Sequence, residues 1–194
     1  RIALNLSGGW QDQYATVFGG FNYIEFKDHE NIVNTLRISD EITSELEDSL
    51  LLCYSGICHD SNEIHNDQKK QMNNKQQKLY ATSSKDIAQS MKARLLKGKL
   101  DDFGELLGQA WSVKKKFSSK ITTPKLDKIY DFAIKNGALG GKLLGAGNGG
   151  YFLFYVPTFN KLKLISMLKK KGLLIESFTF DNTGLRSWIT KKKA

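Results

Sequence analysis

Residues 140–150 have the sequence GGKLLGAGNGG, which holds six of the seventeen glycines of this 194-residue chain. So many glycines cost backbone entropy on folding, which indicates that the segment needs a bare main chain. Exposed backbone N–H groups form hollows that bind anions, with phosphate as the first candidate. We therefore predict that this segment closely approaches a ligand.

The spacing Gly145-x-Gly147-x-x-Gly150 formally matches the dinucleotide-binding fingerprint, but its context differs from that of a Rossmann fold. That fingerprint opens a helix, whereas residues 151–156, YFLFYV, are aromatic and β-branched and predict a strand. The run Lys169–Lys171 stands where a ribose-binding carboxylate is expected. No Walker A sequence occurs either. The segment is thus predicted to join two apolar strands, with a ligand-free hairpin turn as the alternative.

Composition and charge fit an ordinary globular domain, with 40% apolar and 25% charged residues. No apolar run approaches the ~20 residues that span a bilayer, and no signal-peptide pattern opens the chain. We therefore expect a cytoplasmic protein without a membrane partner. The net charge of +9 is concentrated in lysines near the C-terminal end. Because arginines and aromatic residues do not interleave with them, a solvated lysine face is favoured over nucleic-acid binding.

The cysteine pattern predicts a reducing compartment. Cys53 and Cys58 are the only cysteines, and they form neither a CxxC motif nor a disulfide framework. A zinc site that combines them with His59 and His65 lacks the usual ligand spacings. No metal site is therefore predicted from protein ligands.

Residues 10–18, WQDQYATVF, predict a helix because Trp10, Tyr14 and Phe18 recur every four residues. Asp12 lies off this stripe, in the first turn, where the helix dipole and free N–H groups favour a carboxylate. A capping role without chemistry is the alternative for Asp12.

The remaining pattern predicts an α+β domain with helices packed on one face of a sheet. Strands are expected at 21–26, 31–38, 50–54, 173–180 and 185–189, the last two forming an antiparallel hairpin around a turn at 181–184. Helices are expected within 60–84, 87–98, 101–111 and 123–137, and from a cap at Asn160 to Gly172. Residues 39–48 are expected to form a loop or short helix at a domain junction.

Three stretches together resemble the GHMP kinases, which include galactokinase, homoserine kinase and mevalonate kinase. Residues 8–26 contain GGWQDQY and FGGFNYIEF, and residues 118–130 follow the pattern SSKITTPxxDxxY. Residues 140–150 are similar to the third glycine-rich motif of that superfamily. All three have the form found in the D-glycero-D-manno-heptose 7-phosphate kinases, and GWQDQ is the most specific string.

The resemblance implies a sugar kinase that transfers the γ-phosphoryl group of ATP to the anomeric hydroxyl of a heptose phosphate, with ATP and Mg²⁺ as cofactors. The product would serve the synthesis of cell-surface polysaccharide precursors. Asp12 would be catalytic, orienting the acceptor hydroxyl and taking its proton late. Gly8, Gly9, Trp10 and Gln13 would help to bind the sugar. The nucleotide side would be lined by Gly145, Ala146, Gly147, Asn148, Gly149 and Gly150.

The resemblance also implies a domain organisation. Residues 1–45 would end an N-terminal domain similar to domain 2 of ribosomal protein S5, and residues 46–194 would form a ferredoxin-like C-terminal domain with extra helices. The chain begins at Arg1, and residues 1–6 look like the tail of a helix. We therefore expect a fragment, inactive by itself, whose glycine- and serine-rich phosphate loop lies upstream.

Two departures from the family pattern concern the site. Asn148 replaces a more usual glycine, although asparagine tolerates positive φ. His59 replaces a usual arginine, which leaves its contact with a sugar phosphate open. Two other functions also stay open: a kinase of another sugar, such as a galactokinase-like enzyme, and a non-catalytic α+β module that binds a partner or nucleic acid. Association into a homodimer is left open as well.

Overall fold

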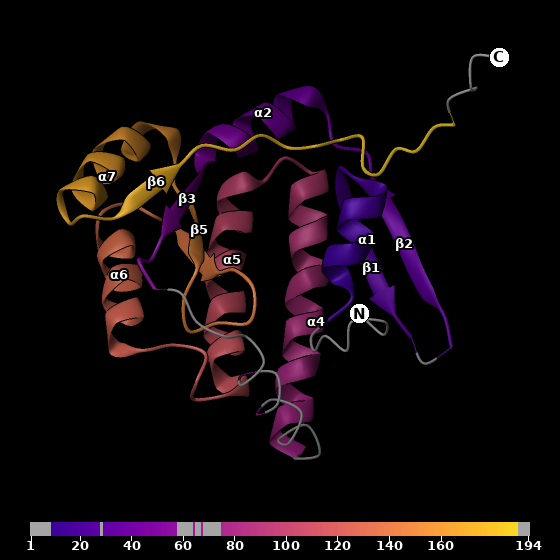
Figure 1. The fold of residues 1–194 in the computed structure, drawn as a ribbon, viewed down its shortest axis with the longest axis horizontal. Coiled ribbons are helices and arrows are strands. Elements are labelled where there is room, and N and C mark those ends of the chain that lie inside the picture. The colour runs from indigo at the N-terminus through magenta and orange to yellow at the C-terminus, as the bar shows by residue number, and fades with distance from the viewer. Residues whose placement is uncertain (1–8, 28, 58–63, 65–66, 68–74, 190–194) are drawn as a thin grey trace. The chain divides into compact units, whose positions relative to one another are not determined.

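The computed structural model describes residues 9–27, 29–57, 64, 67 and 75–189. The fold divides into two compact units, each of which is described by itself. The larger unit contains Ser39–Phe178, and the smaller unit combines Gly9–Ile38 with residues 179–189. Figure 1 shows the elements of both units, coloured along the chain.

The smaller unit contains one helix and one hairpin, as the sequence predicts. Its elements are α1 (Gln11–Phe18), β1 (Phe21–Phe26) and β2 (Asn31–Leu36), and the two strands pair antiparallel. Tyr14 attaches the helix to the hairpin, because its ring lies 5.8 Å from the ring of Phe26. The Tyr14 hydroxyl also accepts a hydrogen bond of 2.9 Å from the Asn31 side chain.

The predicted hairpin near the C-terminal end is wrong. Strand β6 (Leu174–Glu176) is three residues long, and residues 177–189 form no strand. The turn itself is present, since Asp181 Oδ1 accepts hydrogen bonds from the N–H and the hydroxyl of Thr183, at 2.8 and 2.7 Å. The backbone after it pairs elsewhere: the Leu185 N–H donates to the Val17 carbonyl at the end of α1, at 3.1 Å.

The larger unit contains a sheet of four strands in the order β4-β5-β3-β6, with every neighbouring pair antiparallel. The bounds are β3 (Leu50–Tyr54), β4 (Gly140–Leu143) and β5 (Tyr151–Tyr155). Strand β3 is covered on both faces, as its continuous apolar sequence predicts.

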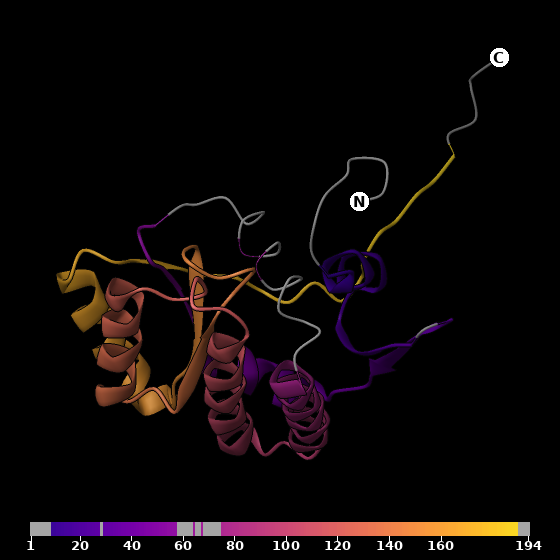
Figure 2. The same cartoon turned by 90° about the horizontal axis from the view of Figure 1, so that it is seen from below.

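Helices of the larger unit lie on both sides of this sheet, which corrects the prediction of a single covered face. They are α2 (Asp40–Ser49), α4 (Lys75–Leu96), α5 (Leu100–Lys114), α6 (Pro124–Lys135) and α7 (Thr158–Lys170), with a 3₁₀ turn at Lys115–Phe117. Figure 2 shows α6 and α7 on one side of the strands, and α5 followed by α4 on the other.

Glycines explain why α5 can lie against the second face. A Cβ built on Gly104 would overlap the ring of Tyr155, and one built on Gly140 would overlap the carbonyl oxygen of Gly104. Gly108 is also close, because its nitrogen would lie 2.8 Å from a Cβ on Gly140. The backbones of α5 and β4 therefore meet with no side chain between them.

Several helix ends follow the predicted signals. Thr123 caps α6 by accepting a hydrogen bond of 3.3 Å from the Leu126 N–H, and Gly137 follows the helix with φ of 107°. The cap predicted at Asn160 is wrong, because α7 begins at Thr158 and its N-cap residue is Pro157, three residues before Asn160. The Asn160 side chain instead lies beside Gly137.

The core of the larger unit is built around aromatic rings on the α6 side of the sheet. Phe152 and Phe154 stack with ring centroids 5.2 Å apart, and Trp111 meets Phe152 edge-on at 6.0 Å. Tyr130 of α6 lies 6.1 Å from Phe154. Cys53 is fully buried in the same core. Within the described ranges, no helix has the length and apolarity needed to cross a membrane.

Gly140→Ala is expected to lower the free energy of unfolding by about 1–3 kcal/mol or more, because α5 must move away from β4. Gly145→Ala is the comparison, since nothing lies within 4 Å of a Cβ there and only the positive φ of 66° opposes it. Its cost should be about 1 kcal/mol. Urea unfolding of both variants measures the difference, and equal costs would contradict the close backbone approach.

Candidate functional site

The glycine loop, residues 144–150 between β4 and β5, has an unusual backbone. Five of its residues have positive φ, between 60° and 157°: Gly145, Gly147, Asn148, Gly149 and Gly150. Asn148 adopts φ of 60°, in the left-handed region that asparagine tolerates, so the loop keeps its shape without a glycine there. This backbone requires the bare main chain that the sequence indicates.

Two distant segments hold the glycine loop in place. The Asn148 N–H donates to the Ile121 carbonyl at 2.6 Å, and the Gly150 N–H donates to the Ile57 carbonyl at 2.9 Å. A Cβ on Gly147 would lie 2.8 Å from the Ile121 oxygen, so only glycine fits against this backbone. The structure thus brings together the glycine loop and the 118–130 stretch, two of the three segments that resemble GHMP kinases.

Four backbone N–H groups of the glycine loop have no acceptor in the part of the chain that the structure describes. They belong to Gly145, Ala146, Gly147 and Gly149. Backbone donors in folded proteins are rarely left without a partner, and successive donors in a glycine-rich turn form an anion-binding hollow. The loop therefore has the donors that a phosphate group requires.

Lys114, the last residue of α5, contacts the glycine loop and was not among the site residues predicted from the sequence. Its ammonium donates to the carbonyls of Leu143 at 2.8 Å and Gly145 at 2.6 Å, and so fixes the first turn of the glycine loop. Burial lowers the pKa of Lys114 to about 7, and the charge of Lys142 adds to this effect. The sequence holds no signal that separates Lys114 from the adjacent Lys115 and Lys116.

A polar network shapes the segment on which the glycine loop rests. Buried Ser118 donates its hydroxyl to the Asp67 carboxylate and accepts a hydrogen bond of 3.1 Å from the Lys120 N–H. Asp127 accepts a hydrogen bond of 3.0 Å from the Thr122 hydroxyl. These bonds fix the backbone on both sides of Ile121, whose carbonyl accepts the hydrogen bond from Asn148 of the glycine loop.

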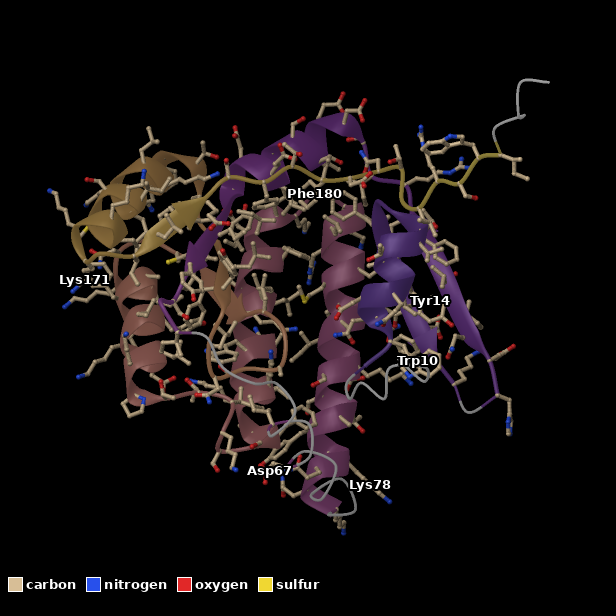
Figure 3. The ribbon with its side chains drawn as sticks, viewed as in Figure 1. Trp10, Tyr14, Asp67, Lys78, Lys171 and Phe180 are labelled. Atoms are coloured by element: carbon tan, nitrogen blue, oxygen red, sulfur yellow. The ribbon has the colours of Figure 1, made fainter. Side chains whose placement is uncertain are left out.

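Asp12 lies in the first turn of α1, as predicted, and is exposed. Together with Gln13, Thr16 and Val17 it lines a shallow hollow of about 280 Å³ in the smaller unit. Trp10 precedes the helix with half of its surface exposed and is labelled with Tyr14 in Figure 3.

The two groups of predicted site residues belong to different units. Asp12, Trp10 and Gln13 are in the smaller unit, and Gly9 begins it, whereas the glycine loop is in the larger unit. Gly8 lies outside the described residues. That the two groups form one site stays a prediction from the sequence.

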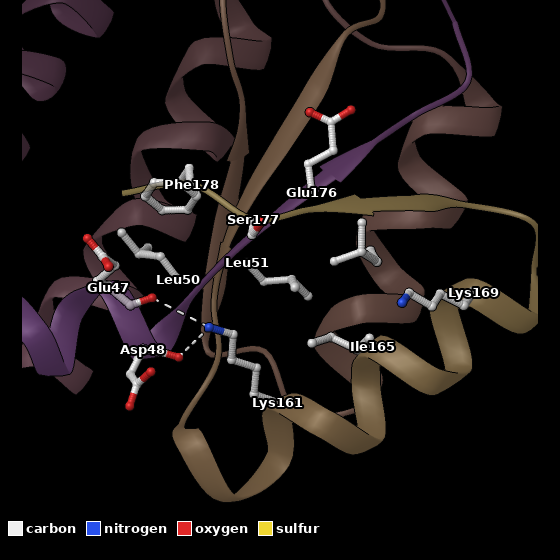
Figure 4. A pocket seen from close by; sticks show the side chains of 11 residues that line it. Glu47, Asp48, Leu50, Leu51, Lys161, Ile165, Lys169, Glu176, Ser177 and Phe178 are labelled. Carbon is white, nitrogen blue, oxygen red and sulfur yellow. Dashed lines mark hydrogen bonds between the residues drawn. The ribbon is translucent and has the colours of Figure 1, made fainter. Parts of the chain in front are cut away.

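A second hollow, of about 450 Å³, lies at the end of β3 away from the glycine loop (Figure 4). Lys161 of α7 crosses it to donate to the carbonyls of Glu47 at 3.4 Å and Asp48 at 2.6 Å. A cation at the last carbonyls of α2 stabilises the end of that helix. This lysine of the basic C-terminal region therefore has a structural partner.

No cluster of three or more potential metal-binding side chains occurs among the residues that the structure describes. Burial raises the pKa of the Cys53 thiol to about 11, so the thiol is protonated at neutral pH. Cys58, His59 and His65 lie outside the described residues.

Comparison with known proteins relates this chain to a family of kinases. Residues 91–172 match the family model of the GHMP kinase C-terminal region. This region is therefore similar to the C-terminal region of the GHMP kinases, and the resemblance seen in the sequence is confirmed.

Individual relatives make the comparison more specific. The chain is 37% identical over 189 residues to the D-glycero-alpha-D-manno-heptose 7-phosphate kinase of Campylobacter jejuni, covering 97% of this chain and 56% of that protein. It is 31% identical over 153 residues to the L-fucokinase/L-fucose-1-P guanylyltransferase of Bacteroides fragilis, covering 76% of this chain and 16% of that protein.

A solved structure of a heptose kinase has a similar fold. A D-glycero-D-manno-heptose 1-phosphate kinase from Bacteroides thetaiotaomicron aligns with a TM-score of 0.67 and 30% identity, covering 98% of this chain and 52% of that chain. The present chain thus spans about half the length of the heptose kinases that it matches.

Lys114→Met is expected to flatten the pH dependence of stability between about pH 7 and the ordinary lysine pKa of 10.5. In this window the unfolded chain keeps the Lys114 proton while the folded protein has released it. The unfolded state then binds more protons, so the free energy of unfolding rises with pH, by at most roughly 1.4 kcal/mol per pH unit. Below this window both states are charged and the dependence ends.

Urea unfolding of the wild type and the variant at several pH values in this window measures the effect. Lys128→Met removes an exposed lysine of α6 and serves as the control. A wild-type profile that runs parallel to that of Lys114→Met would contradict a lowered pKa at Lys114.

Proposed function

We propose that this chain supplies the C-terminal half of a sugar kinase that transfers the γ-phosphoryl group of ATP to the anomeric hydroxyl of a heptose phosphate. The observation that carries the proposal is the glycine loop, with its four N–H groups free of protein acceptors within the described ranges. The identity of 37% to a heptose 7-phosphate kinase supports the choice of acceptor. Synthesis of cell-surface polysaccharide precursors is the corresponding role.

Each part of the proposed site has a physical task. Phosphoryl transfer depends mainly on positioning the reactants and neutralising charge on the transferred group. The backbone donors of residues 145–150 would hold phosphate oxygens, because they are fixed by the contacts with Ile57 and Ile121. Asp12 would orient the acceptor hydroxyl and take its proton late. Gly8, Gly9, Trp10 and Gln13 would shape the sugar side.

Mg²⁺ would neutralise charge on the phosphates of bound ATP. The glycine loop itself offers N–H groups and lies against the Lys114 ammonium, and these donors suit phosphate oxygens and not a cation. We therefore propose that the metal arrives with ATP and that this part of the chain binds the phosphates themselves.

We also propose that residues 46–194 form a ferredoxin-like domain with added helices. The chain order β3, helices, β4, β5, α7, β6 and the strand order β4-β5-β3-β6 support this assignment. Residues 1–45 would complete an N-terminal domain of the ribosomal protein S5 type, and the protein would act in the cytoplasm.

A second candidate is a kinase for an unphosphorylated sugar. The identity of 31% to an L-fucokinase is the observation that favours it. A panel of free sugars and sugar phosphates, tested with ATP and the full-length protein, separates the two candidates by the acceptor that supports turnover.

Asp12→Asn in the full-length protein is expected to lower kcat for the sugar kinase reaction at least about 10²-fold, because the acceptor hydroxyl loses its proton acceptor. Release of ADP that depends on added sugar measures the effect. Asp40→Asn is the matched control, since Asp40 is also an exposed carboxylate in the first turn of a helix. Turnover that Asp12→Asn leaves unchanged would defeat the catalytic role.

A further inference from the structure

Lys142 of β4 is a partly buried lysine whose ammonium contacts no acceptor and no carboxylate among the residues that the structure describes. Within the larger unit, the described ion pairs join Arg94 to Asp102 and Lys115 to Asp127. A lysine in such a place loses hydration without gaining a partner, and burial lowers the pKa of Lys142 accordingly.

The register of β4 places Lys142 on the α5 side of the sheet. Its neighbours Gly141 and Leu143 face the other side, where Gly141 lies against Phe154 and Leu143 is fully buried. Side chains alternate along a strand, so Lys142 faces α5, which carries Lys114 at its end. The two charges are close enough for Lys142 to lower the pKa of Lys114.

Among the residues that the structure describes, only one of these two lysines has hydrogen-bond partners. Lys114 donates to the carbonyls of Leu143 and Gly145, which are neutral groups and cannot balance a positive charge. The pair therefore places positive charge, without a carboxylate partner among the described residues, next to the first turn of the glycine loop, which Lys114 contacts. Four backbone N–H groups of that loop also lack acceptors within the described ranges. All of these features call for an anion with several oxygens.

We propose that Lys142 binds a phosphate oxygen of a substrate held at the glycine loop. A phosphate supplies both the negative charge that the two lysines lack and acceptors for the loop, and lysine binds phosphate as a point charge. The inference rests on the proposed function, in which ATP and the acceptor sugar both carry phosphate. Either source offers the same chemistry.

The test measures binding to the full-length protein by titration calorimetry, with and without Lys142→Met. The probes are a non-hydrolysable ATP analogue with Mg²⁺ and, separately, D-glycero-D-manno-heptose 7-phosphate. We expect the affinity for one probe to fall by about 10- to 100-fold, the range of a charge-assisted hydrogen bond. Weaker binding of the nucleotide analogue assigns Lys142 to ATP, and weaker binding of the sugar phosphate assigns it to the acceptor.

Lys128→Met removes an exposed lysine of α6 and should leave both affinities unchanged. If Lys142→Met does not fold, Lys142→Gln removes the charge with a smaller change in polarity. Affinities for both probes that stay within about threefold of the wild type, in a folded variant, would overturn the proposal. If the full-length protein shows no sugar-dependent ATP turnover but its binding of either probe depends on Lys142, only the proposed kinase reaction is contradicted.

Discussion

The contact between the backbones of α5 and β4 determines where the groups around the glycine loop lie. Gly104 and Gly140 meet without side chains, so the helix lies directly against the edge strand. The last turn of α5 consequently ends beside the last residues of β4, and Lys114 reaches the carbonyls of Leu143 and Gly145. A side chain at either glycine would separate the two elements and carry Lys114 away from the loop.

The glycine loop depends on a second close approach, to the backbone at Ile121. Gly147 fits there because it has no Cβ, and Asn148 completes the contact with a hydrogen bond to the Ile121 carbonyl. Ser118 and Thr122 fix the supporting segment by donating to the carboxylates of Asp67 and Asp127. Backbone contacts thus hold the loop, while four of its N–H groups have no acceptor among the described residues, an arrangement suited to an anion.

Local signals in the sequence predicted the elements that form from local interactions. Thr123 and Gly137 marked the ends of α6, and the apolar run at residues 50–54 marked a buried strand. The predictions that failed depended on distant partners. Residues 185–189 have the composition of a strand, but their backbone bonds to the end of α1, and Asn160 packs beside Gly137 instead of capping a helix.

In the candidate site, too, the sequence predicted local features and did not predict those that depend on distant contacts. The glycine density predicted a loop with a bare backbone, and the family resemblance named Asp12 and residues 145–150. Lys114 could not be found in this way, because nothing within its own lysine run distinguishes it from Lys115 and Lys116. Its importance arises only when α5 is placed against β4. Lys142 was visible within the glycine segment, but only the folded chain shows that no described carboxylate pairs with it.

The smaller unit is discontinuous in the sequence, since residues 179–189 join Gly9–Ile38 after the whole of the larger unit has intervened. The Leu185 N–H bonds to the Val17 carbonyl, and Gly19 lies against Gly184 with no room for a side chain. On the ribosome, where domains generally fold as they emerge, α1 therefore gains these contacts only after residues 39–178 have been made. Until then the Val17 carbonyl at the end of α1 lacks the hydrogen bond that the Leu185 N–H gives it in the folded unit.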